Sequence, residues 1–191
     1  ATDLAGDDDR NRSWARTGQW TGNQDALNAH GLCPPDVFRE RVEFRAVDMN
    51  RVPDDLQDYD FTWSTCSFEH CGSLELGLAF LERQLGCLRP GGVAVHTTEF
   101  NLSSNDRTVA RGPNVIYRLR DIEEFVAKIT ARGHHVEPLD IDPGDTEPDR
   151  FIDPPPYHGS TGRAPGGFKH LRLNLDGYAS TSIGLIIRRA A

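Results

Sequence analysis

Polar side chains gather where one predicted strand ends. The apolar residues 93–95 are followed by the polar residues His96, Thr97, Thr98, Glu99 and Asn101. So many hydrogen-bonding groups after a buried strand are hard to explain by core packing, because each buried polar group needs a partner. Ligands of open α/β sheets bind beyond the carboxyl ends of the strands. We therefore expect this group of side chains to face a ligand.

Glu69 and His70 follow an aromatic strand predicted over residues 59–64. A Glu beside a His at a ligand crevice can act as a general base or can orient one. The alternative is a pair at the start of a helix that only bonds to the backbone. Position alone favours that second interpretation.

Two aspartates also follow predicted strands. Asp3 ends the apparent strand 1–4 and can accept hydrogen bonds from a ribose diol. Its alternative is an acid on a surface loop. Asp48 follows the strand 42–48 and can accept from an adenine amino group, with Met49 against the ring. A turn or N-cap role for Asp48 is slightly favoured by position.

The cysteines indicate neither disulfides nor a closed metal site. The chain has four, Cys33, Cys66, Cys71 and Cys87, and none forms a C-x-x-C motif. The cluster Cys66, His70 and Cys71 matches no zinc-site spacing. We therefore predict buried free thiols and no metal. His158 flanks a long Pro/Gly-rich loop over residues 142–169, where a histidine is usually solvated.

Strand and helix patterns alternate along the chain, which is typical of an α/β doubly wound sheet. Leucines at positions 74, 78, 81, 85 and 88 predict a helix capped by Ser73. A second helix is expected from Asp121, read as the start of a capping box, to Gly133. A short helix is expected over residues 24–30. Further strands are predicted over residues 93–98, 135–141, 171–175 and 182–188.

Composition excludes some classes of partner. The net charge is −8 and the pI is about 5.3, which argues against nucleic acid bound through a broad basic surface. No stretch approaches the roughly 18 apolar residues of a membrane span, and residues 1–10 do not resemble a signal peptide. We expect a cytoplasmic chain without membrane or nucleic-acid partners. The sequence does not indicate an oligomeric state.

Four segments together resemble class I S-adenosylmethionine (SAM)-dependent methyltransferases. They are residues 47–50 (VDMN), 59–64 (YDFTWS), 68–70 (FEH) and 88–95 (LRPGGVAV). The resemblance covers residues 42–100 well and the later helix and last strand more loosely. It implies a Rossmann-like, mostly parallel sheet with helices on both faces and an antiparallel last strand, in a single domain over residues 1–191.

The family's first strand and glycine-rich loop have no counterpart in residues 1–191, and Gly91-Gly92 precedes a strand instead of a helix. We expect a chain truncated at its N-terminus, possessing the equivalent of the second strand at residues 1–4 but lacking the first central strand. The sheet should then show a gap, or its first two strands should dock differently. SAM affinity should be low or absent.

The resemblance implies transfer of the sulfonium methyl of SAM to a small-molecule or sugar-like acceptor. The expected base for a hydroxyl acceptor is His96, followed by Glu99 and His70. The residues expected to bind the cofactor are Asp3, Leu4, Asp48, Met49 and Ser64. Those expected to bind the acceptor are Glu69, Thr98, Asn101 and His158.

Two other hypotheses stay open. The first is that the chain is a non-catalytic, methyltransferase-like binding module, which the absence of the glycine-rich loop favours. Less consistent with the sequence is another nucleotide-binding Rossmann-like enzyme, such as a reductase. Tyr117 and Lys128 are too far apart for the Y-x-x-x-K spacing of that class.

Overall fold

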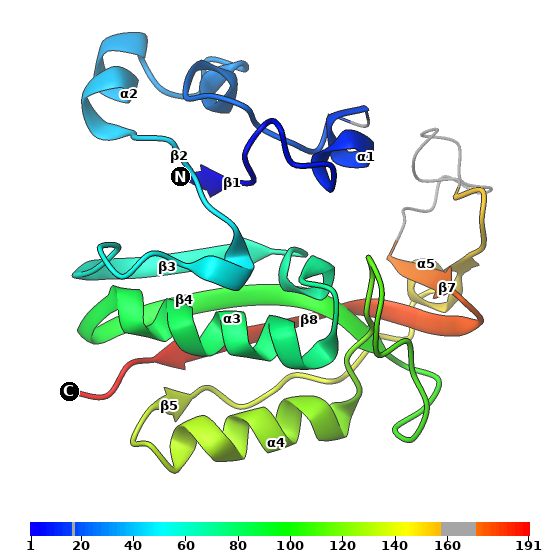
Figure 1. Cartoon of the computed structure of the whole chain (residues 1–191). Helices are drawn as coiled ribbons and strands as arrows, with labels where there is room; N and C mark the ends of the chain where they lie inside the picture. The colour runs from blue at the N-terminus through cyan, green and yellow to red at the C-terminus, as the bar shows by residue number, and fades with distance from the viewer. Residues whose placement is uncertain (17, 158–170) are drawn as a thin grey trace. The chain divides into compact units, whose positions relative to one another are not determined.

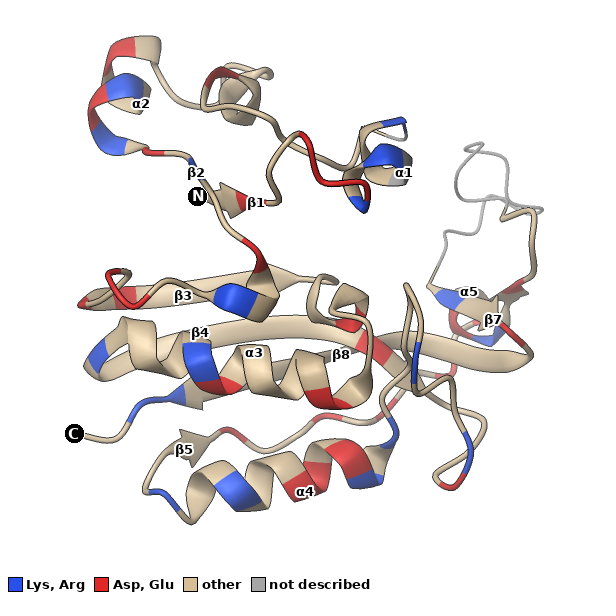
Figure 2. Ribbon diagram, in the orientation of Figure 1, with Lys and Arg blue, Asp and Glu red and all other residues tan. Residues whose placement is uncertain are grey.

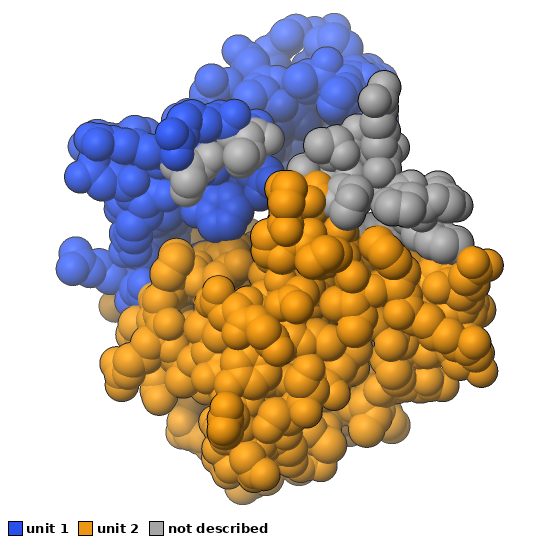
Figure 3. All heavy atoms as spheres, turned by 90° about the vertical axis from the view of Figure 1, so that its right-hand side faces the viewer, with its two compact units in different colours: residues 1–53 blue, residues 54–191 orange. Residues whose placement is uncertain are grey.

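The computed structural model describes residues 1–16, 18–157 and 171–191. The chain divides into two compact units, residues 1–53 and residues 54–191, drawn in blue and orange in Figure 3. The predicted acceptor-binding residue His158 lies outside the described residues. No helix in the described ranges combines the length and apolar character needed to cross a membrane.

The first unit is built from short elements. Strands β1 (Thr2–Asp3) and β2 (Arg45–Ala46) pair in parallel as a two-stranded sheet of their own. The interruption expected in the sheet is therefore present. The other elements are α1 (Asn11–Arg16), η1 (Asp25–Asn28), α2 (Pro35–Arg41) and η2 (Met49–Arg51).

One helix and one strand of this unit are shorter than the sequence predicted. The helix predicted over residues 24–30 is the single 3-10 turn η1, which ends at Asn28. Of the strand predicted over residues 42–48, only the two residues of β2 pair with a neighbouring strand, since Asp48 already caps η2.

The second unit contains a six-stranded sheet (Figure 1). Its main order is β3-β4-β8-β7-β6, and β5 also pairs with β8. From the pairings, β8 runs against all the other strands of this sheet, which share one direction. The predicted α/β class with a mostly parallel sheet and an antiparallel last strand is confirmed. The strands are β3 (Tyr59–Thr65), β4 (Leu88–Asn101), β5 (His135–Val136), β6 (Ile152–Asp153), β7 (Arg172–Leu175) and β8 (Tyr178–Arg188).

Helices α3 (Leu74–Cys87) and α4 (Leu119–Thr130) pack side by side against one face of this sheet (Figure 1). The core between them is aliphatic and aromatic. Glu82 of α3 accepts hydrogen bonds from Lys128 of α4 and from Arg132 just beyond it, which ties the two helices together at the surface. Figure 2 colours the charged positions along both helices. Fully buried residues of this core include Leu81, Ala94, Ile122, Leu185 and Ile187.

Side chains of the opposite sheet face alternate with these core residues, as the pleat of a strand requires. Phe61 and Trp63 are 48% and 67% exposed on β3. Trp63 lies beside Val95 of β4, which lies beside Ile186 of β8. An apolar stripe thus crosses three strands of this face.

Several boundaries differ from the sequence prediction. Helix α4 begins two residues before Asp121, which therefore lies in the first turn of the helix. Its carboxylate accepts a hydrogen bond from the Arg118 backbone N–H at 2.9 Å. The strand predicted over 135–141 stops at Val136. Strand β8 starts four residues before the predicted Ser182, because residues 176 and 177 take positive φ and close a hairpin with β7. The predicted loop 142–169 contains helix α5 (Glu147–Arg150) and β6.

Helix α3 approaches its neighbours most closely at Gly77. A Cβ atom there would meet the Tyr117 hydroxyl oxygen and the Phe68 carbonyl oxygen at 2.0 and 2.5 Å. Gly77→Ala should therefore destabilise the protein by about 1–3 kcal/mol or more, measured by denaturant unfolding.

Gly86 in the same helix is the matched control, because a Cβ there meets nothing within 4 Å. Gly86→Ala should raise stability by about 0.5–1 kcal/mol through helix propensity. Equal effects of the two substitutions would contradict the close approach at Gly77.

Candidate active site

The carboxyl end of β3 lies beside residues 96 and 97 of β4, with which it pairs in parallel, and β4 continues to Asn101 instead of ending at the predicted residue 98. Ser64 pairs with His96, and Thr65 pairs with Thr97. The chain leaves β3 through Cys66, whose φ is 43°. The Cys66 backbone N–H donates to the Thr97 carbonyl at 3.0 Å and contacts the Thr97 hydroxyl at 3.1 Å. This contact fixes the first residue beyond the strand.

Glu69 lies in the 3-10 turn η3 (Phe68–His70), and its side chain is 1% exposed. Its Oε2 accepts a hydrogen bond from the Thr98 hydroxyl at 2.8 Å. Burial, together with the nearby negative charge of Glu99, raises the pKa of Glu69 to about 7, although the hydrogen bond from Thr98 opposes the shift. Burial is the dominant cause.

Ligand-type atoms of Cys66, Glu69 and Glu99 all lie within 4.8 Å of one another. The Cys66 Sγ lies 3.6 Å from both the Thr97 and the Ser182 hydroxyl oxygens. The Ser180 hydroxyl donates to a Glu99 carboxylate oxygen. We call Cys66, Glu69 and Glu99 the thiol–carboxylate cluster.

His70 lies at the edge of this cluster. Its Nδ1 lies 2.8 Å from the Pro113 carbonyl oxygen, and only a protonated nitrogen can donate to that acceptor. Its Nε2 is 4.0 Å from Glu69 Oε1. Burial lowers the pKa of His70, partly opposed by the bond to Pro113. The neutral ring therefore carries its lone pair on Nε2.

His96, the expected base, is fully buried. Its Nδ1 lies 2.8 Å from the Ser64 hydroxyl, and the rings of Phe68 and Phe80 approach it edge-on at 6.3 Å. Burial lowers the pKa of His96 to about 4. Its Nε2 has no hydrogen-bond partner among the described residues. The structure thus places His96 on the core side of β4, with Ser64 as its contact.

Thr98 and Asn101, expected to bind the acceptor, are both buried. Thr98 orients Glu69, as described above. Asn101 organises the turn that follows β4: its Oδ1 accepts from the backbone N–H groups of Ser103 and Ser104 at 2.8 and 3.0 Å. The hydrogen bonds described for Thr98 and Asn101 are therefore made within the protein.

In the first unit, Asp3 and Leu4 hold a loop. The Asp3 carboxylate accepts from the backbone N–H groups of Leu4 at 2.8 Å and Thr21 at 3.0 Å. The Trp20 indole N–H donates to the Leu4 carbonyl at 3.0 Å. Asp3 is therefore more than a solvated surface acid.

Asp48 caps η2 by accepting from the Asn50 N–H at 2.9 Å, and Met49 is the first residue of that turn. The Arg10 guanidinium also donates to Asp48, at 2.8 Å. Partial burial raises the pKa of Asp48, but the bonds from Arg10 and Asn50 outweigh it and the net shift is downward. The N-cap role that position favoured is thus observed.

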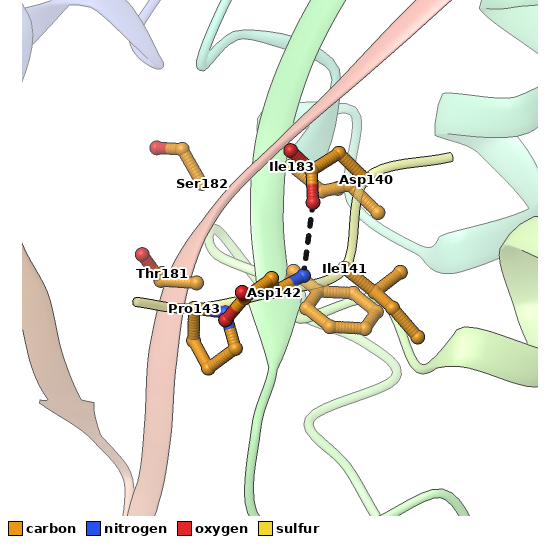
Figure 4. Close-up of a pocket in the computed structure, with 8 residues that line it drawn as sticks. Asp140, Ile141, Asp142, Pro143, Thr181, Ser182 and Ile183 are labelled. Atoms are coloured by element: carbon orange, nitrogen blue, oxygen red, sulfur yellow. Dashed lines mark hydrogen bonds between the residues drawn. The ribbon is translucent and has the colours of Figure 1, made fainter. Parts of the chain in front are cut away.

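A small hollow lies beside the strand β8 (Figure 4). Its volume is about 100 Å³, well below the roughly 300 Å³ at which small-molecule sites begin. Asp140 and Ser182 are among its lining residues, and Ser182 also touches Cys66. The hollow is too small for a nucleoside cofactor.

The sequence prediction missed Cys66, Ser180 and Ser182 as neighbours of the acidic residues. All four cysteines carry thiols outside disulfides; Cys71 and Cys87 are buried, whereas Cys33 and Cys66 are only partly so. No short sequence motif predicts that these residues lie together, because their proximity depends on the antiparallel register that sets Glu99 beside Ser182.

Comparison with known proteins supports the fold and not a particular family member. No family model and no curated protein matches the chain. The cyclase SpnF aligns with 88% of this chain and 62% of its own, at 16% identity and a TM-score of 0.54. A proposed sarcosine dimethylglycine methyltransferase from Galdieria sulphuraria aligns with 99% of this chain and 68% of its own, at 13% identity and a TM-score of 0.52.

A complex of DhpI with S-adenosylhomocysteine (SAH) aligns with 87% of this chain and 60% of its own, at 16% identity and a TM-score of 0.45. The chain thus spans about three fifths of the length of SpnF and DhpI. The fold that these comparisons define is the class I SAM-dependent methyltransferase fold. The fold implied by the sequence resemblance is confirmed.

The buried His96 predicts a pH-dependent stability. The unfolded chain binds a proton at this residue below about pH 6.5, whereas the folded protein does so only near pH 4. The contribution of His96 to stability is therefore fully present above pH 6.5 and falls by on the order of 2–3 kcal/mol as the pH drops to about 4. His96→Leu should lack this loss when urea unfolding is followed against pH.

The exposed His135 of β5 provides the control. His135→Gln should keep the pH profile of the parent protein. A His96→Leu profile parallel to that of the parent between pH 4 and 6.5 would refute the buried neutral state of His96.

Proposed function

We propose that this chain is a SAM-dependent methyltransferase, or the part of one, that acts on a small-molecule acceptor. The observation that carries the proposal is the methyltransferase fold combined with polar side chains at the carboxyl end of β3 and along the carboxyl-terminal part of β4 beside it. Ligands bind at this edge in open α/β sheets.

Cofactor binding is proposed for Asp3, Leu4, Asp48 and Met49, which all lie in the first unit. A cofactor contact of Ser64, in the second unit, is a separate proposal. Asp3 is proposed to accept hydrogen bonds from the ribose hydroxyls, and Asp48 from the adenine amino group. Each already accepts hydrogen bonds within the protein. Cofactor binding must therefore add to these bonds or replace them.

The proposed reaction is an in-line displacement. The acceptor's lone pair forms a bond to the methyl carbon, the carbon–sulfur bond breaks, and its electron pair returns to the sulfur to give SAH. Alignment of nucleophile, methyl group and sulfur is the main contribution of the protein. We propose His70 as the base for a hydroxyl acceptor, because its ring is anchored through Nδ1 and its side chain is 20% exposed.

His96 is proposed to position Ser64, since its burial keeps it from touching an acceptor. Glu69, Thr98 and Asn101 are proposed to shape the acceptor side of the site through the elements that they hold. Glu99, which is partly exposed, is proposed to face the acceptor.

Calorimetric titration with SAM and SAH tests the proposal. Detectable binding weaker than micromolar, that is, less favourable than about −8 kcal/mol, is the expected result, because residues 1–191 have no counterpart of the family's glycine-rich loop. Asp48→Asn should weaken it about tenfold or more, because a hydrogen bond to a charged acceptor is worth about 1.5–3 kcal/mol. Asp7→Asn, at an exposed position of the same unit, should leave it unchanged.

Absence of binding from a chain that still melts cooperatively would overturn the proposal for this chain and favour the non-catalytic binding module. The melting curve of each variant separates loss of binding from loss of folding. SpnF is named as a cyclase, so the fold by itself does not fix the reaction.

A further inference from the structure

We propose that the thiol–carboxylate cluster of Cys66, Glu69 and Glu99 binds a divalent cation of the zinc type. The cluster joins a sulfur and two carboxylates from the end of β3, from η3 and from β4. Every member belongs to the second unit, so the proposal needs nothing from the first. It does not rest on the proposed methyl transfer.

The separations suit a compact cation site. The candidate ligand atoms lie within 4.8 Å of one another. In a tetrahedral zinc site with metal–ligand distances of about 2.0–2.3 Å, neighbouring ligand atoms are about 3.3–3.7 Å apart. The ligand atoms must therefore approach one another by on the order of 1 Å to reach that arrangement.

A shell of hydroxyl groups surrounds the candidate ligands. Thr98 donates to Glu69, Ser180 donates to Glu99, and the Thr97 and Ser182 hydroxyls contact the Cys66 sulfur. Thr98 and Ser180 are fully buried. Outer partners of this kind hold metal ligands in a fixed orientation. Two exposed acids and a surface thiol would have no such shell.

Charge supplies the physical reason for a cation. The Glu69 side chain is 1% exposed and its carboxylate lies within 4.8 Å of that of Glu99. Two like charges repel strongly when water is largely excluded from around one of them. A divalent cation between them converts this repulsion into attraction and also favours the thiolate form of Cys66.

The donor set selects the metal. Magnesium and calcium prefer oxygen ligands, whereas a thiolate favours a softer ion such as zinc. Three protein ligands leave a fourth position of a tetrahedral site for water or another oxygen ligand. Cys66 and Glu99 are partly exposed, so that position can open toward solvent.

Cobalt(II) titration of the full chain, under reducing and anaerobic conditions without SAM, tests the site. Cobalt bound to a thiolate gives a near-ultraviolet charge-transfer band. We expect this band to grow to one equivalent of cobalt and to disappear when zinc is added. Cys66→Ser should abolish it, and Glu99→Gln should weaken cobalt binding at least tenfold.

Cys33→Ser is the matched control, because Cys33 is also a free, partly exposed thiol but lies in the first unit. It should leave the band unchanged. Absence of the band, its survival in Cys66→Ser, or unchanged cobalt affinity in Glu99→Gln would each overturn the site.

Circular dichroism and thermal melting of each variant establish that it is folded. If Cys66→Ser does not fold, Cys66→Ala and Glu99→Gln carry the same test. Because SAM is absent from the titration, failure of the metal site and failure of SAM binding appear in different experiments.

Discussion

The parallel pairing of β3 with β4 is the constraint on which the second unit depends. It sets Ser64 beside His96 and Thr65 beside Thr97, so β3 ends beside the polar residues of β4, which itself continues to Asn101. The bonds from the Cys66 N–H to Thr97 then fix where the chain turns away. A slip of one residue would exchange the two faces of β3, sending Ser64 outward and Trp63 into the core.

The sequence predicted those elements whose signals are local and repeated. The leucine stripe and Ser73 placed α3 within one residue of its true bounds, and the aromatic run placed β3 equally well. Asp176-Gly177, a dipeptide typical of hairpin turns, lies between β7 and β8. Short strands such as β5 and β6 were less predictable, because two ladder residues leave no alternation to detect.

The residues of the candidate site were likewise predictable only where the sequence signal is local. The prediction that polar residues gather at the end of β4 follows from strand order, and it identified Glu99 and Thr98. It did not reveal that His96 points into the core, because alternation along β4 assigns faces only once the helix-covered side is known. It also did not join Cys66 to Glu99, since that contact depends on packing between distant segments.

The apolar stripe on the uncovered sheet face has a consequence for handling the protein. β3 ends the order of the six-stranded sheet, and Tyr59, Phe61 and Trp63 on it are all exposed. An edge strand with such side chains is a template for pairing with another chain, and thus an aggregation hazard. Asp60 on the intervening position, paired with Arg89, puts charge on this edge and works against such growth. Loss of the Asp60–Arg89 ion pair would leave the exposed aromatic side chains of this edge strand without that charge.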